Sequence, residues 1–200
     1  MTGFSGSGKD SVLCPLLESG KAYHVVTAVS RSRRVASNEP ESAYIWMRQR
    51  NNGESEDQYY KNLVKEYSLL EHDCHYGNIY GLPLESLQKK GKGFPVVRTD
   101  ISGVITLKDV LPNYDFQPIS IAVMPDSWNQ VYDSIINRAS ESEEDAMKRF
   151  LEDVGNIQRY EMNINYFLHN SRERTSDGIS GLEASVNALG YLVDEYSRDI

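Results

Sequence analysis

The chain has 200 residues, a net charge of −8 at neutral pH and 40% hydrophobic residues, which suits one α/β domain of ordinary composition. The acidic balance argues against a nucleic-acid partner, and no apolar run approaches the ~20 residues that span a bilayer, which argues against a membrane protein. The absence of a signal-peptide pattern and the presence of only two cysteines, Cys14 and Cys74, favour the cytoplasm, where thiols stay reduced.

Helical, extended and polar patterns follow one another along the first half of the chain. Gly20 ends a helical pattern that starts after a glycine-rich run, and Pro83 suits the first turn of a later helix. In chain order we predict a helix over 10–18, a short buried strand over 24–29, loop and edge-strand structure over 30–57, a helix over 56–70 and a helix over 83–91.

The second half of the chain alternates apolar runs with amphipathic patterns. We predict a strand over 94–99, a helix over 102–111, a strand over 119–124, a helix over 127–137, a helix over 143–160, a strand over 164–169 and a helix over 182–196. Such alternation implies a parallel sheet with helices on both faces. No repeat or Pro/Gly-rich linker interrupts the pattern, so we predict a single domain over 1–200.

The run Gly3-Phe4-Ser5-Gly6-Ser7-Gly8-Lys9 matches the phosphate loop G-x-x-x-x-G-K. Its glycines allow backbone N–H groups to surround phosphate oxygens, with Lys9 reaching the β- and γ-phosphates. The next position normally holds a Ser or Thr that binds Mg²⁺, whereas here Asp10 and then Ser11 are the candidate metal ligands. A carboxylate can bind a metal but also repels phosphates, and the simpler alternative is a glycine-rich turn that caps a helix.

The start of this chain leaves little room for the buried strand that normally precedes a phosphate loop. Only Met1 and Thr2 come before Gly3. We therefore expect either that the natural start lies upstream or that the sheet lacks most of a central strand.

Three arginines, Arg31, Arg33 and Arg34, lie together in an otherwise acidic chain. Guanidinium groups bind phosphate oxygens bidentately, and Arg31 and Arg34, three residues apart after a strand, can both face one anion. The simpler alternative is a solvated surface patch.

The run His72-Asp73-Cys74-His75 contains residue types that bind metals. The four side chains are crowded, and no second cluster of such residues lies nearby in the sequence. We therefore expect ordinary loop residues between Glu71 and Tyr80.

The most specific run in the chain is EHDCHYGNIYG, residues 71–81. Its spacing, Glu-x-x-x-x-x-Gly-Asn-x-Tyr-Gly, resembles the guanylate kinase family, and the likeness extends from Gly3 to about Asn170. Positions that fall in register with the family's Ser/Thr-x-x-x-Arg-x-x-Arg pattern and its tyrosine are Thr27, Arg31, Arg34 and Tyr44, whereas Glu39 matches the family's glutamate only with a one-residue gap. The run 138–144 is similar to the family's lid, and Arg149 and Asn170 stand at an expected arginine and at an asparagine beside the adenine.

The resemblance implies a P-loop NTPase fold, a three-layer α/β sandwich with a central parallel sheet. The core would comprise 1–29, 83–137 and 144–200, with a monophosphate-binding region over 30–82 and a lid over 138–143. The implied reaction transfers the γ-phosphoryl group of ATP, with Mg²⁺, to GMP or dGMP. ATP and a nucleoside monophosphate would be the partners of a monomer or homodimer.

The resemblance also assigns roles to single residues. Lys9, Arg138 and Arg149 would be catalytic, and ATP would be bound by Gly3, Ser5, Gly6, Ser7, Gly8, Lys9, Asp10, Ser11 and Asn170. GMP would be bound by Thr27, Arg31, Arg34, Glu39, Tyr44, Glu71, Tyr80, Gly81 and Asp100. An ionised Glu71 can accept hydrogen bonds from guanine N1–H and the exocyclic amine, whereas adenine presents an acceptor at N1.

Three positions depart from the family pattern. Leu82 replaces a Ser or Thr near the base, Arg98 replaces the first acidic residue of a strand-end pair, and Ser134 replaces a lid arginine. Two alternatives therefore stay open beside the kinase: a guanylate kinase-like binding module without catalysis, and a kinase for another (deoxy)nucleoside monophosphate.

Overall fold

The computed structural model describes residues 1–4, 6–33, 39–75, 77–89, 91–127, 129, 131–133, 143–171 and 178–197. Its helices are α1 (Lys9–Glu18), α2 (Glu56–Glu66), α3 (Leu84–Gln88), α4 (Ile101–Val110), α6 (Glu143–Tyr160) and α7 (Gly181–Tyr196). Its strands are β1 (Thr2–Gly3), β2 (Ala22–His24), β3 (Ala28–Val29), β4 (Ile45–Trp46), β5 (Leu69–His75), β6 (Asn78–Pro83), β7 (Phe94–Val96), β8 (Ile121–Pro125) and β9 (Tyr166–Asn170). Short 3₁₀ turns lie at Glu41–Ala43, Leu111–Tyr114 and Glu161–Asn163.

The core of the molecule is a parallel sheet. β1, β8 and β9 pair in that order, and β2 pairs with β7, all in parallel. Met1 N donates to Val97 O at 2.7 Å, and Thr99 N donates to Met1 O at 3.2 Å. These two bonds join the sheets into the order β2-β7-β1-β8-β9. The central strand is therefore present, although its ladder with β8 spans only Thr2 and Gly3.

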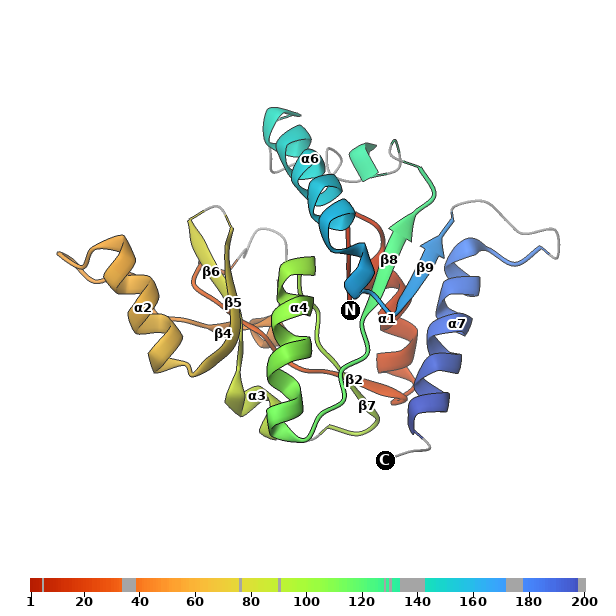
Figure 1. The fold of residues 1–200 in the computed structure, drawn as a ribbon, viewed down its shortest axis with the longest axis horizontal. Coiled ribbons are helices and arrows are strands. Elements are labelled where there is room, and N and C mark those ends of the chain that lie inside the picture. The colour runs from red at the N-terminus through yellow and green to blue at the C-terminus, as the bar shows by residue number, and fades with distance from the viewer. Residues whose placement is uncertain are drawn as a thin grey trace.

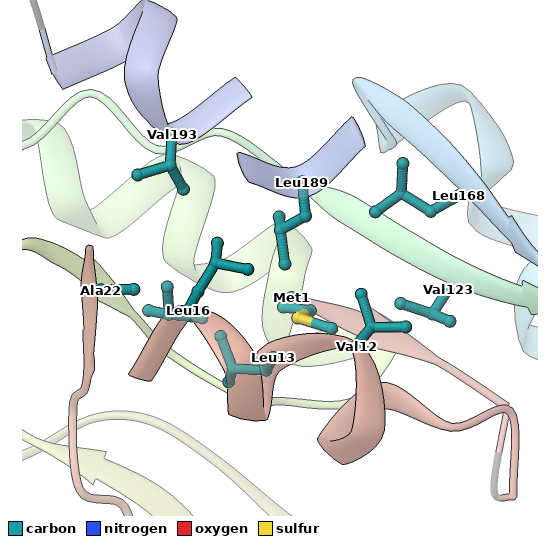
Figure 2. Close-up of a cluster of buried hydrophobic side chains, with 10 residues drawn as sticks. Met1, Val12, Leu13, Leu16, Ala22, Val123, Leu168, Leu189 and Val193 are labelled. Atoms are coloured by element: carbon teal, nitrogen blue, oxygen red, sulfur yellow. The ribbon is translucent and has the colours of Figure 1, made fainter. Parts of the chain in front are cut away.

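Helices cover both faces of this sheet, as the βα alternation predicted (Figure 1). On one face, α1 and α7 pack together, and their apolar side chains meet those of the strands (Figure 2). This cluster consists of Met1, Val12, Leu13, Leu16, Ala22, Val96, Val123, Leu168, Leu189 and Val193. On the other face, Ala122 of β8 packs against α4. Because β8 is covered on both sides, its sequence is apolar almost throughout.

A second, smaller sheet is formed by strands between Ala28 and Pro83. Its order is β4-β3-β6-β5, in which β3 is parallel to β4 and antiparallel to β6, and β5 and β6 form an antiparallel hairpin. α2 packs on it through Tyr59 and Leu63. Figure 1 shows this sheet and α2 set to one side of the parallel sheet.

The helices predicted over 10–18, 102–111, 143–160 and 182–196 are confirmed within one or two residues. The single strand predicted over 24–29 is wrong, because the chain leaves β2 after His24 and enters the other sheet at Ala28. Apolar periodicity alone does not reveal which strand will be the partner. The helix predicted over 127–137 and the lid fall largely outside the described residues.

The helix predicted over 56–70 ends earlier than expected, and the loop predicted over 71–80 is wrong because a strand begins before it. α2 ends at Glu66, Ser68 adopts a left-handed conformation with φ of 47°, and β5 begins at Leu69. Polar side chains on both faces of β5 hid its strand period, since the alternation of apolar and polar residues is the usual strand signal. Among the helices that the structure describes, none combines the length and the apolar character needed to span a bilayer.

Candidate active site

The phosphate loop is built on backbone conformations and contacts that only glycine permits. Gly3 and Gly8 have φ of 137° and 85°. A β-carbon at Gly3 would lie 2.2 Å from Val123 O, and one at Gly8 would lie 2.3 Å from the amide nitrogen of Asn170. Any larger residue would therefore push the loop away from β8 and β9.

Lys9 folds back over this loop. Its Nζ donates to Gly3 O at 2.8 Å and to Phe4 O at 2.7 Å. Asn170, at the end of β9, donates from Nδ2 to Ser7 O at 2.8 Å. The loop is thus fixed from within by the lysine and from the side by the asparagine.

A cleft of about 370 Å³ begins at the phosphate loop and reaches the smaller sheet. From the loop side it is lined by Gly3, Lys9 and Asp10, and from the other side by Thr27, Arg31, Tyr44, Glu71, Tyr80, Gly81 and Asp100. These are residues for which the sequence predicted nucleotide contacts. The remaining lining residues are Thr2, Phe4, Asp73, Arg98, Thr99, Ile101, Glu152, Asp153 and Asn156.

Arg31 forms a charged cluster at one end of this cleft. Its guanidinium donates to both oxygens of Glu39, at 2.8 and 2.6 Å, and lies over the rings of Tyr44 and Trp46 at 5.3 and 5.5 Å. The bonds to Glu39, followed by one with Tyr80, raise the pKa of Arg31 above its ordinary value. Glu39 itself does not line the cleft, so the structure places it as a partner of Arg31.

Glu71 lies on β5, and only 5% of its surface is exposed. Thr99 Oγ1 donates to Glu71 Oε1 at 3.4 Å. Gly103, in the first turn of α4, makes this closeness possible, because a β-carbon there would lie 2.0 Å from Thr99 Oγ1 and 2.5 Å from Glu71 Oε1. The carboxylate is therefore held between β5 and the first turn of α4, at the position where Gly103 has no side chain.

Two further carboxylates lie beside Glu71. Asp100 caps α4 by accepting from Gly103 N at 2.7 Å. Ser102 Oγ lies 2.8 Å from Asp73 Oδ2 and 2.9 Å from Asp100 Oδ1, so its single hydrogen is shared between them. Sequence reasoning missed Asp73 because it expected a loop; a strand period of two, counted from Glu71, would have found it.

The alternation along β5 also separates the potential metal ligands of the run 72–75. Asp73 faces the cleft, whereas the neighbouring His72 and Cys74 are exposed. Within the part of the chain that the structure describes, no group of three or more His, Cys, Asp or Glu side chains is placed to hold a metal ion.

Arg98 follows β7 and lines the cleft next to the phosphate loop. Its Nε donates to His24 Nε2 at 3.1 Å, and its Nη1 donates to Asp10 Oδ1. Burial, with a further contribution from Arg98, lowers the pKa of His24 to about 4. His24 is therefore neutral near pH 7, and its Nε2 can accept the hydrogen bond.

The comparison with known proteins agrees with this geometry. The chain is 29% identical to the guanylate kinase of Clostridium tetani over 204 residues, an alignment that covers all of this chain and 89% of the relative. It is also 29% identical to the guanylate kinase of Clostridium acetobutylicum over 202 residues, again with all of this chain and 89% of the relative covered.

The fold agrees as well. The crystal structure of guanylate kinase from Anaplasma phagocytophilum matches with a TM-score of 0.61 at 17% identity, covering 93% of this chain and 80% of that one. The chain is thus similar to guanylate kinases along its whole length and shares the fold of one of them. No family model matches it.

Asp10, which departs from the phosphate-loop motif, and Arg98, which departs from the guanylate kinase pattern, are neighbours in the fold. The sequence shows them 88 residues apart, and only the fold brings their charges together. A third departure, Leu82, is fully buried and packs with Val25 and Leu107. The hydroxyls of Thr27 and Thr99 line the cleft instead.

Several residues predicted from the resemblance to guanylate kinases either do not line the cleft or lie outside the described residues. Ser11 is exposed and does not line the cleft. Ser5, Arg34 and Arg138 are outside the described residues, and so is the side chain of Arg149, whose backbone lies in α6. Ser134, which replaces a lid arginine, is also outside them. The structure adds Glu152, Asp153 and Asn156 of α6 to the lining of the cleft. No sequence signal had marked them.

Proposed function

We propose that this chain transfers the γ-phosphoryl group of ATP to GMP or dGMP. The observation that carries the proposal is that Lys9, Arg31 and Glu71 line the same cleft of about 370 Å³. A phosphate loop at one end and a guanidinium with a buried carboxylate at the other suit two nucleotides placed end to end.

The described residues suggest how each part of GMP is held. Glu71 accepts hydrogen bonds from guanine N1–H and the exocyclic amine, a pairing that adenine cannot offer. Arg31, with Arg34 as predicted from sequence, binds the substrate phosphate, and Glu39 keeps the Arg31 guanidinium oriented. A site of paired bonds rejects the wrong base strongly, because mismatch leaves a buried polar group without a partner.

Phosphoryl transfer itself needs positioning and charge neutralisation more than covalent chemistry. We propose that Lys9, which bonds Gly3 O and Phe4 O in this structure, exchanges these bonds for the phosphates of ATP. Arg138 and Arg149 are proposed to join it when the lid over 138–143 closes and excludes water. No protein nucleophile is required.

Magnesium, which neutralises phosphate charge in such kinases, does not fit the two ligands that the sequence suggested. The carboxylate of Asp10 is occupied by Arg98, and Ser11 is exposed outside the cleft. We therefore propose that ATP brings Mg²⁺ on its own phosphates, and we assign no side chain of this chain to the metal.

An assay of ADP release tests the proposal. Purified protein with ATP and Mg²⁺ should turn over GMP or dGMP, and Lys9→Ala should lower turnover by several orders of magnitude. Lys21→Ala, which removes a half-exposed lysine paired with Asp194, is the matched control and should leave turnover unchanged. Binding of GMP without ADP release from any monophosphate would favour the non-catalytic module instead.

The localisation, oligomeric state and partners of this enzyme are proposed from the sequence. We propose a cytoplasmic enzyme that acts as a monomer or homodimer, with ATP and a nucleoside monophosphate as its partners and no nucleic acid. Sedimentation of the purified protein would distinguish the two oligomeric states.

A further inference from the structure

Arg98 is held from two sides in a way that the guanylate kinase motif does not contain. His24, at the end of β2, accepts from Nε, and Asp10, in the first turn of α1, accepts from Nη1. His24 lies on the parallel sheet and Asp10 on α1, and their bonds to Nε and Nη1 orient the guanidinium. Its side chain remains 30% exposed and lines the cleft.

The positive charge of Arg98 offsets the negative charge of Asp10. A carboxylate directly after Lys9 would repel the phosphates that the loop surrounds. Arg98 neutralises it and brings a second cation to the same end of the cleft as Lys9. Among the described residues, no hydrogen bond uses Arg98 Nη2, so this group still has donors to offer.

We propose that Arg98 binds the phosphate groups of ATP and takes over the neutralising role that a hydroxyl-bound Mg²⁺ has in other phosphate loops, with Asp10 and His24 as positioning residues. The inference rests on the proposed binding of ATP at Gly3–Lys9. Its consequence is that ATP affinity in this chain depends less on Mg²⁺ than it does in a phosphate loop with Ser or Thr after the lysine.

Calorimetric titration with ATP, in EDTA and in Mg²⁺, tests this without catalysis. Arg98→Gln should weaken ATP binding in EDTA by about 10- to 150-fold, the effect of losing a charge-assisted hydrogen bond. The double variant Asp10→Ser/Arg98→Asp restores the usual pattern of hydroxyl and acid. It should bind ATP weakly in EDTA and regain affinity in Mg²⁺, whereas the parent chain should change far less between the two buffers.

Two controls separate binding from folding. Arg50→Gln removes one exposed charge away from the cleft and should leave both titrations unchanged. Melting temperatures would show that each variant is folded.

The outcomes distinguish this inference from the proposed function. A parent chain that requires Mg²⁺ as strongly as the double variant would overturn the role of Arg98 and leave the kinase proposal intact. The same holds if ATP binds and Arg98→Gln has no effect in EDTA. A parent chain that binds no ATP in either buffer would overturn both.

Discussion

Gly103 and Glu71 approach so closely that a β-carbon on Gly103 would lie 2.5 Å from Glu71 Oε1. Real β-carbons do not tolerate such a contact, and the atom in the way belongs to a side chain that is only 5% exposed. The position of the carboxylate that is proposed to read the base thus depends on a residue with no functional group.

Gly103→Ala should therefore displace Glu71 or shift the start of α4. We expect GMP affinity to fall by about tenfold or more and the free energy of unfolding to fall by about 1–3 kcal/mol, as for other overpacked sites. Gly190→Ala in α7 is the control, because a β-carbon there meets nothing within 4 Å. It should stabilise the chain by about 0.4–1 kcal/mol without changing GMP binding.

Glu71→Gln tests the reading of guanine. The amide keeps the size of the side chain but offers one acceptor and no charge, so one paired bond is lost. We expect GMP affinity to fall by about 10- to 150-fold, equivalent to ~1.5–3 kcal/mol, with ATP affinity little changed. If titration shows that the variant binds GMP as tightly as the parent, the assignment of guanine to this pocket is wrong.

Arg31→Ala should weaken binding of every monophosphate without base selectivity. Arg31 is proposed to bind phosphate and to ignore the base, so GMP, dGMP and AMP should all lose affinity by a similar factor. Part of the effect will come from Glu39, which is only 15% exposed and would be left without its bidentate partner. Titration of the three monophosphates should give parallel losses, and a loss confined to GMP would contradict the assignment.

The bond between His24 and Arg98 should make stability depend on pH in a defined window. The pKa of His24 is lowered from 6.5 to about 4, chiefly by burial, so the unfolded chain binds the proton first as the pH falls. The free energy of unfolding should therefore decrease between about pH 6.5 and pH 4, by on the order of 1–2 kcal/mol once partial exposure is taken into account.

His24→Gln keeps an acceptor for Arg98 but cannot titrate. Urea unfolding at pH 7, 6 and 5 should therefore show a shallower decline for this variant than for the parent. The ion pair of Glu54 with Arg48 lowers the pKa of Glu54 from 4.5 to about 2 and adds its own pH dependence below about pH 4.5, but both proteins contain it, so it cancels in the comparison. Equal slopes for the two proteins would show that His24 does not remain neutral in the folded chain.

The sequence by itself determined the features that depend on neighbours in the chain. The phosphate loop could be predicted because its glycines and lysine act through local backbone geometry, and α1, α4, α6 and α7 because an apolar stripe repeats every 3.6 residues. The resemblance of residues 71–81 to the guanylate kinase pattern pointed to Glu71, Tyr80 and Gly81, all of which line the cleft.

Only the tertiary structure decided which distant charges meet. Arg98 and Asp10 are 88 residues apart, and each looked like an isolated departure until parallel pairing placed β7 beside β1. Asp73 lines the cleft because it lies on β5 of the β5–β6 hairpin. Polar residues on both faces of β5 had hidden its strand period in the sequence. Contacts of this kind are set by strand pairing across the sheet, and no periodicity along the chain records which strands will pair.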